Sequence, residues 1–265
     1  MGHVEWIRFA RVDRVPAPGE IAHSFDDWEQ AGGGGAVAAL QLASLADETV
    51  LFTAFGDDEL GARAKSELEH RGVRVHAAVE RAPTRWALTQ VDETGERTIT
   101  TVGGKLRPRG HDDRLPWNEL GEMDAVLFVA GDVDALVLAR RAPILTAVTR
   151  ELDVLRRGSV QLEALVGSGE DDAERFRPGE LEPPPTLVVT TSGALGGWMQ
   201  PGGPYSASEV PGKVEDTYGA GDCFAAGLTF ALAEGLVGHE AVTFASRCGA
   251  AALTGRGVAP QAVAR

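Results

Sequence analysis

The residues best suited to chemistry lie near the C-terminus, in the string Asp216-Thr217-Tyr218-Gly219-Ala220-Gly221-Asp222. Two glycines flank an alanine immediately before an apolar stretch that predicts a helix over residues 220–234. With so little side-chain bulk, the backbone N–H groups of Gly219, Ala220 and Gly221 can converge on an anion at the helix N-terminus. A carboxylate beside that anion is electrostatically unfavourable, so a carboxylate at this position suggests a chemical role. Accepting a proton from an attacking hydroxyl is such a role for Asp222.

A second interpretation of Gly219–Asp222 needs no ligand. Glycine turns often precede helices, and an aspartate in the first turn complements the helix dipole. These four residues alone leave both interpretations open.

The full Asp-Thr-x-Gly-Ala-Gly-Asp string resembles the C-terminal signature of the ribokinase-like (PfkB-type) carbohydrate kinases. Other segments resemble that family in order and spacing over nearly the whole chain, although the chain is somewhat short for it. They are the lid-entry loop Pro16–Glu20, the N-terminal signature Gly32–Gly35 with Thr53–Gly61, the nucleotide-side loop Thr191–Gly197, and Arg256-Gly257 beside the adenine.

This resemblance implies an ATP-dependent kinase in which Asp222 is the catalytic base. Gly219, Ala220 and Gly221 would form the anion hole for the transferring phosphoryl group. Such transfer depends mainly on positioning and charge stabilisation, which backbone amides and one base can supply. A Walker-type kinase is excluded because the chain has no GxxxxGK[ST] motif. The nucleotide side would comprise Thr191, Gly193, Gly196, Asp216, Thr217, Arg256 and Gly257.

The acceptor side departs from the family pattern at two positions. The aspartate that usually grips sugar hydroxyls corresponds to Ile7, and the asparagine after the double glycine corresponds to Val37. Glu5 shares a strand face with Ile7, so it is either a substitute hydroxyl acceptor or a solvated strand-end carboxylate. We therefore expect an acceptor other than free ribose or fructose bound in the usual manner. The residues predicted around the acceptor are Glu5, Ile7, Gly33, Gly34, Val37 and Trp86, with Arg85 beside Trp86.

The motif that orders the metal is also altered. The family's Asn-x-x-Glu should follow the predicted strand 164–166, where this chain has Ser168-Gly169-Glu170-Asp171. Asp171 or Glu170 could still hold Mg²⁺ through water, because that ion keeps several waters and needs few protein carboxylates. The alternative is a polar loop that opens an acidic helix.

Composition and charge limit the class of protein. A chain of 265 residues suits one large α/β domain, and a net charge of −14 with scattered Lys and Arg argues against nucleic-acid partners. Two cysteines without Cys/His clusters predict neither a disulfide framework nor zinc. Neither a signal peptide nor a membrane span is evident, so we expect a cytoplasmic protein without membrane partners.

The elements that must position these residues follow from the apolar pattern. Apolar runs alternating with amphipathic stretches predict a mostly parallel central sheet covered by helices. Residues 86–101 alternate around Asp92–Glu96, which predicts a hairpin with Gly95 at the turn. With the resemblance, we expect a single three-layer α/β/α domain over 1–265 and a small β-sheet lid from about 14–30 and 84–102. The expected strands are 3–9, 21–28, 50–55, 125–130, 144–148, 164–166 and 187–191, and the expected helices are 35–45, 58–71, 220–234 and 240–254.

The leading hypothesis is an ATP- and Mg²⁺-dependent kinase that acts on a hydroxyl of a small sugar-like or nucleoside-like molecule. The alternative is a regulatory protein of the same fold that binds nucleotide or metabolite but has lost turnover. Ile7, Val37 and Ser168 favour the alternative, whereas the intact Asp222 favours the enzyme. The lid sheet could also pair with that of a second subunit to form a homodimer.

Overall fold

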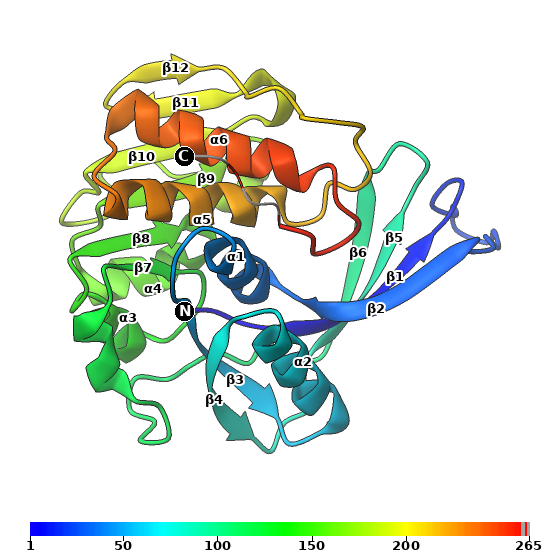
Figure 1. The fold of residues 1–265 in the computed structure, drawn as a ribbon, viewed down its shortest axis with the longest axis horizontal. Coiled ribbons are helices and arrows are strands. Elements are labelled where there is room, and N and C mark those ends of the chain that lie inside the picture. The colour runs from blue at the N-terminus through cyan, green and yellow to red at the C-terminus, as the bar shows by residue number, and fades with distance from the viewer. Residues whose placement is uncertain (261–262, 264–265) are drawn as a thin grey trace.

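The body of the protein is built on parallel strands, as the computed structural model of residues 1–260 and 263 shows (Figure 1). A six-stranded sheet has the order β12-β11-β10-β9-β8-β7, and a parallel pair consists of β3 and β4. The bounds are β3 Val50–Gly56, β4 Arg74–Glu80, β7 Ala125–Phe128, β8 Ile144–Val148, β9 Ala164–Ser168, β10 Leu187–Thr191, β11 Gly197–Gln200 and β12 Gly203–Tyr205.

Residues 1–2 join these two sheets. The N–H of Gly2 donates to Phe52 O in β3 (3.0 Å), and the N–H of Val129 donates to Met1 O just beyond β7 (2.9 Å). The central sheet is therefore continuous from β4 to β12. Only β11 and β12 run antiparallel to their neighbours, so the predicted mostly parallel sheet is confirmed.

Helices cover both faces of this sheet, which gives the three predicted layers. Side chains alternate along β7, so Leu127 packs under one helical layer and Val126 and Phe128 pack under the other. The first layer contains α1 (Gly34–Ala43), α5 (Ala220–Ala233) and α6 (Gly238–Ala252), and the second contains α3 (Val133–Ala139) and α4 (Leu152–Gly158). Helix α2 (Glu59–His70) packs on β1 to β4. None of the helices in the described residues is long and apolar enough to cross a bilayer.

The lid is a four-stranded sheet that projects to one side of the body (Figure 1). Its order is β2-β1-β5-β6, with β1 parallel to β5 and the other pairs antiparallel. The bounds are β1 Glu5–Arg11, β2 Asp26–Gly32, β5 Trp86–Val91 and β6 Arg97–Val102. Because β1 begins at Glu5, three residues after Gly2, the lid sheet starts close to the middle of the central sheet.

The expected elements agree with the structure except at the weakest patterns. Strands β8 and β10 have the predicted bounds, and the hairpin β5–β6 turns at Gly95, whose φ is +86°. Strand β2 begins at Asp26 rather than near residue 21, because Ile21 lies in a loop with 85 % of its surface exposed. Sequence patterns did not predict β4, the short strands β11 and β12, or the seven-residue helices α3 and α4.

Close packing of α5 on α6 depends on a glycine in the middle of α5. A Cβ on Gly227 would lie 2.7 Å from Sγ of Cys248 in α6. We predict that Gly227→Leu lowers the free energy of unfolding by about 1–3 kcal/mol, the usual cost of overpacking a filled core. Urea unfolding measures this. Gly221→Ala in the same helix is the control, because a Cβ there meets nothing within 4 Å; equal stability of both variants would contradict the packing account.

Candidate active site

The N-terminus of α5 is open to a ligand. Gly219 is its N-cap and adopts a left-handed conformation (φ +77°), and no side chain caps the helix. The N–H of Cys223 donates to Gly219 O (2.9 Å). The preceding N–H groups, of Ala220, Gly221 and Asp222, have no acceptor within the described chain. Such a helix end favours an anion through both its free donors and its dipole.

Neither packing nor backbone conformation requires glycine at position 221. Gly221 is exposed, lies within α5, and a Cβ on it would meet no atom within 4 Å. The absence of a side chain therefore leaves open space above the free N–H groups of this turn. Gly219 differs, because its positive φ and a Cβ contact of 2.7 Å to Cγ1 of Val37 both require glycine.

The N-terminus of α1 lies directly against Asp222. A Cβ on Gly34 would be 2.8 Å from Oδ1 of Asp222, and a Cβ on Gly33 would be 3.2 Å from Cγ of Glu5. Gly33 has φ +82°, so it also depends on glycine for its backbone. Glu5 and Asp222 therefore both lie against the turn that begins α1. The structure thus brings together four of the predicted residues.

Asp222 is half-buried in the first turn of α5. Burial raises the pKa of its carboxyl group above the usual value, the charge of His3 opposes this change, and the charge of Glu174 adds to it. A raised pKa makes the carboxylate a better proton acceptor.

The loop 216–219 is held by its buried aspartate. Asp216 is 2 % exposed, and its carboxylate accepts hydrogen bonds from the N–H of Tyr218 (2.7 Å) and the N–H of Gly257 (2.9 Å). Burial raises the pKa of Asp216, and these two hydrogen bonds oppose that change. Tyr218 in turn accepts from the N–H of Gly33 (2.9 Å). Asp216 and Gly257, predicted to support the nucleotide side, therefore fix the loop that carries the anion site.

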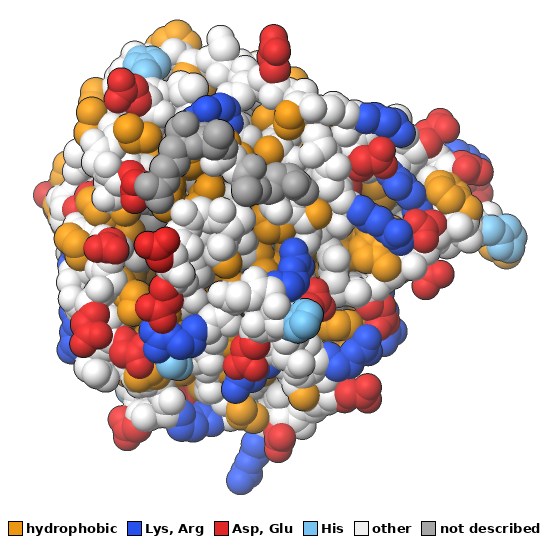
Figure 2. Space-filling view, viewed as in Figure 1, with side chains coloured by type: hydrophobic (Ala, Val, Ile, Leu, Met, Phe, Trp, Pro, Cys, Tyr) orange, Lys and Arg blue, Asp and Glu red, His pale blue; other side chains and the backbone are white. Residues whose placement is uncertain are grey.

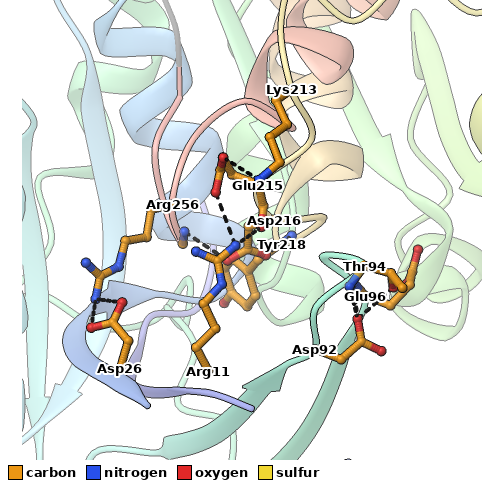
Figure 3. Close-up of polar contacts among 11 residues, drawn as sticks. Arg11, Asp26, Asp92, Thr94, Glu96, Lys213, Glu215, Asp216, Tyr218 and Arg256 are labelled. Atoms are coloured by element: carbon orange, nitrogen blue, oxygen red, sulfur yellow. Dashed lines mark hydrogen bonds and ion pairs between the residues drawn. The ribbon is translucent and has the colours of Figure 1, made fainter. Parts of the chain in front are cut away.

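The lid contacts this loop through arginines. Arg11 Nη2 donates to the backbone oxygen of Glu215 (2.8 Å) and lies 3.2 Å from its carboxylate, as Figure 3 shows. From β6, Arg97 donates to Oγ1 of Thr217 (2.9 Å), and the N–H of Thr217 donates to Gly95 O at the hairpin tip (3.1 Å). Figure 2 shows both signs of charge interspersed over the lid end of the molecule. The lid is thus latched to the loop beside Asp222.

On the acceptor side, Glu5 is buried between the side chains of His3 and Arg85. Its Oε1 lies 3.3 Å from Nε2 of His3 and 3.2 Å from Nε of Arg85. Burial alone would raise the pKa of Glu5, but the hydrogen bond and charge of His3, with the charges of Arg85 and Lys105, lower it below its usual value. Glu5 is therefore a buried, paired carboxylate rather than a solvated strand end.

The structure places Ile7 and Val37 in the core and Trp86 under an arginine side chain. Ile7 and Val37 are buried in the core, at 0 % and 1 % exposed, and Tyr218 packs in the same cluster. Trp86 is half-buried beneath the guanidinium of Arg8 (4.9 Å from Cζ to the ring centroid). Their predicted roles in binding the acceptor stay predictions.

The predicted nucleotide residues form two groups. Thr191 ends β10, and Gly193 and Gly196 follow it; Gly193–Leu195 forms the 3₁₀ turn η4, and Gly196 has φ +91°. Arg256 lies on the other side, with its Cζ 3.9 Å from the Trp28 ring centroid and its Nη2 2.9 Å from Asp26 (Figure 3). Arg256 is thus engaged with β2 of the lid, and Gly257 with Asp216.

On the predicted metal side, Glu174 is a carboxylate whose negative charge helps to raise the pKa of Asp222. The sequence did not predict this residue. Glu174 accepts from the N–H of Ser168 (3.0 Å) and pairs with Nε of Arg150 (2.7 Å). Both oxygens of Asp171 are engaged, by Arg150 Nη2 (2.7 Å) and by the N–H of Ala173 (2.9 Å). Glu170 is exposed beside Gly193. The 3₁₀ turn η3 (Asp172–Glu174) brings Glu174 back to Ser168, six residues earlier, where a fixed Asn-x-x-Glu spacing could not find it.

Two surface cavities lie outside this site. One of about 500 Å³ is lined by residues of α5 and α6 such as Phe230, Phe244 and Arg247, and one of about 570 Å³ lies between Trp6 and α2. Neither lining includes a predicted site residue. Within the described chain, a close group of possible metal ligands occurs at His111, Asp132 and Asp134.

The family of the chain follows from a comparison of sequences. The model of the pfkB family carbohydrate kinases matches residues 1–152 and 161–264. The chain belongs to this family. It is accordingly a phosphotransferase that acts on a hydroxyl group.

Relatives of known name agree with this assignment. The chain is 30 % identical over 282 residues to an ATP-dependent ribose-1-phosphate kinase of Halopiger xanaduensis, covering 94 % of this chain and 89 % of that one. Among solved structures, ribokinase from Thermotoga maritima is similar with TM-score 0.74 at 21 % identity, covering 97 % and 92 %. The Arabidopsis thaliana ribokinase complexed with ribose and ATP is similar with TM-score 0.72 at 20 % identity, covering 97 % and 92 %. These structures establish the ribokinase fold.

The raised pKa of Asp222 predicts a cost to stability. A folded-state pKa above that of the unfolded chain means that stability falls as pH rises through the interval between the two values. Asp222→Asn cannot ionise, so it should unfold at a higher temperature than the native protein at pH 7, and the difference should shrink near pH 4. A gain of about 1 kcal/mol would raise Tm by about 2–4 °C in a protein of this size.

Thermal unfolding at both pH values measures this effect. Asp47→Asn, at an exposed position, is the control and should leave Tm unchanged. A lower Tm for Asp222→Asn at pH 7 would contradict the burial account.

Proposed function

We propose that this chain transfers the γ-phosphoryl group of ATP to a hydroxyl of a small sugar-like or nucleoside-like molecule, with Asp222 as general base. One observation carries the proposal: Asp222 lies in the same helical turn as the free N–H groups of Ala220 and Gly221. A proton acceptor and an anion site so close together suit the deprotonation of a hydroxyl as it attacks a phosphoryl group.

The donor is supported by two relatives. The Halopiger enzyme is named as ATP-dependent, and the Arabidopsis ribokinase was solved with ATP and ribose. On this chain the nucleotide would lie between the loop that follows β10, with Thr191, Gly193 and Gly196, and the Arg256-Gly257 turn. Asp216 and Thr217 would hold the loop between them.

The reaction balances with these groups alone. The acceptor O–H proton moves to a carboxylate oxygen of Asp222 as the acceptor oxygen bonds to the γ-phosphorus. The bond from that phosphorus to the β–γ bridging oxygen breaks, and ADP leaves with the electron pair. The N–H groups of Ala220 and Gly221 stabilise the negative charge on the transferring group.

Residues near the site fit Mg²⁺ bound mainly by phosphate oxygens and water. Mg²⁺ commonly uses one or two carboxylates and keeps several waters. Glu174 would be that carboxylate, because its negative charge acts on Asp222. Both oxygens of Glu174, like those of Asp171, already have protein partners, so either residue would bind the ion in place of one of them or through water. Glu170 is exposed and could assist through water. When bound, the ion would offset charge on the transferring phosphate.

A regulatory protein that binds nucleotide without turnover is the second candidate. It is favoured by Ile7, Val37 and Ser168, which replace polar family residues, and by the burial of Ile7 and Val37 in the hydrophobic core. The free N–H groups beside Asp222 favour the enzyme.

We further propose that residues 1–265 form one cytoplasmic catalytic unit that pairs through the lid. Strand β6 is an exposed edge, with Ile99 and Val102 each more than 40 % exposed. Unprotected edges of this kind invite pairing with another chain.

The decisive experiment measures ADP release with a panel of ribose, fructose, their phosphates and several nucleosides. Asp222→Asn should lower kcat with the preferred acceptor by about 10²–10⁴-fold, the usual contribution of a general base. Its affinity for ADP should be unchanged, because the N–H groups of α5 remain.

Asp47→Asn is the matched control and should retain native turnover. Near-native kcat in Asp222→Asn would remove this residue from the mechanism. A rise in Tm with nucleotide but no ADP release from any acceptor would support the regulatory candidate instead.

A further inference from the structure

Tyr218 is the bulky residue of the loop that carries the anion site. Its side chain is 8 % exposed, and its ring meets Phe9 edge-on with 5.3 Å between centroids. The same hydrophobic cluster contains Ile7 and Val37. These are two of the positions where the sequence predicts contact with the acceptor. The ring of Tyr218 therefore packs where an acceptor was expected.

The hydroxyl of Tyr218 lies against the turn that begins α1. The N–H of Gly33 donates to it (2.9 Å). A Cβ on Gly32 would lie 2.9 Å from the same oxygen and 2.6 Å from Cγ1 of Ile7. The hydroxyl and Ile7 thus converge on the backbone of this turn. Because Tyr218 already uses the N–H of Gly33, that donor is not available to a hydroxyl of the acceptor.

Tyr218 also borders the space between Glu5 and Asp222. Burial raises the pKa of its hydroxyl above the usual value, the hydrogen bond from Gly33 opposes this change, and the negative charges of Glu5 and Asp222 add to it. Both carboxylates lie against the turn that begins α1. The tyrosine hydroxyl, the predicted acceptor contact and the proposed base therefore share one small region.

This arrangement limits how an acceptor can lie. With its reacting hydroxyl at Asp222, a polyol that extended toward Ile7 would collide with the ring of Tyr218. Its hydroxyls on that side would also face Ile7 and Val37, which offer no hydrogen bonds. Hydroxyls buried without partners weaken binding. Polar parts of the acceptor are therefore accommodated on the side of Glu5.

We propose that Tyr218 is a specificity-determining residue: it fills the part of the acceptor site beside Ile7 and occupies the N–H of Gly33, and so it excludes free ribose. The proposal rests on the proposed function and concerns the choice of acceptor at that site. Removing the ring should open the site and return the N–H of Gly33 to a ligand.

Equilibrium binding of ribose tests this without requiring turnover. Calorimetry in the presence of ADP compares the native protein with Tyr218→Val and Tyr218→Phe. We expect Tyr218→Val to bind ribose about tenfold or more tightly than the native protein, because space and one donor are gained. Tyr218→Phe keeps the ring in place and should bind ribose within about twofold of native. The affinity for ADP should stay within about twofold in both variants.

A cavity elsewhere in the same cluster is the matched control. Leu68 in α2 is 0 % exposed, and Leu68→Ala should lower Tm, as Tyr218→Val does, without changing the affinity for ribose. If Tyr218→Val does not fold, Tyr218→Leu retains more of the packing and still shortens the side chain. Ribose should then raise the Tm of Tyr218→Leu but not that of the native protein.

Three outcomes would overturn the proposal: native protein that binds ribose as tightly as folded Tyr218→Val, an equal gain in Tyr218→Phe, or an equal gain in Leu68→Ala. Failure of transfer gives a different pattern. If Tyr218→Val gains ribose binding but neither it nor the native protein releases ADP with any acceptor, the proposed function fails while the role of Tyr218 stands. If the native protein turns over another acceptor but Tyr218→Val gains nothing, only the role of Tyr218 fails.

Discussion

The site depends on the close approach of two helix N-termini, those of α1 and α5. Each helix contributes a glycine where the other has a side chain: Gly34 faces the carboxylate of Asp222, and Gly219 faces Val37. Without these glycines the two helices would separate, and Asp222 would lose both its burial and its position beside the anion site. The raised pKa of Asp222 is a direct consequence of this packing.

Contacts between the lid and the loop 216–219 hold the N-terminus of α5 in place. Arg11 and Arg97 reach from the lid to the loop, and Arg256 reaches back to the lid, where it stacks on Trp28. Trp28 stacks on Phe9 (4.7 Å between centroids), and Phe9 meets Tyr218 edge-on (5.3 Å). A movement of the lid would therefore shift the side chain of Tyr218, four residues before Asp222.

Much of this arrangement could be predicted from the sequence, because strong patterns reflect strong physical requirements. Buried parallel strands such as β8 and β10 are mostly apolar. Gly219 is needed for the turn before α5, and Gly221 leaves space for a ligand there. Glu174 could not be predicted, because it reaches Ser168 through a 3₁₀ turn rather than at fixed spacing. The contact of Arg85 with Glu5 could not be predicted either, because only the fold brings residue 85 beside residue 5. The burial of Ile7 depends likewise on Tyr218, more than 200 residues away.

The most direct test of Asp222 as a buried base is the pH dependence of kcat/KM for the preferred acceptor. The base works only when ionised, so activity should fall as pH falls through its folded-state pKa. Because burial raises that pKa, the fall should occur above the usual aspartate value of 3.8. The residual activity of Asp222→Asn should lack this fall. Native activity that stays constant down to about pH 4 while the protein remains folded, or an identical fall in Asp222→Asn, would contradict the account.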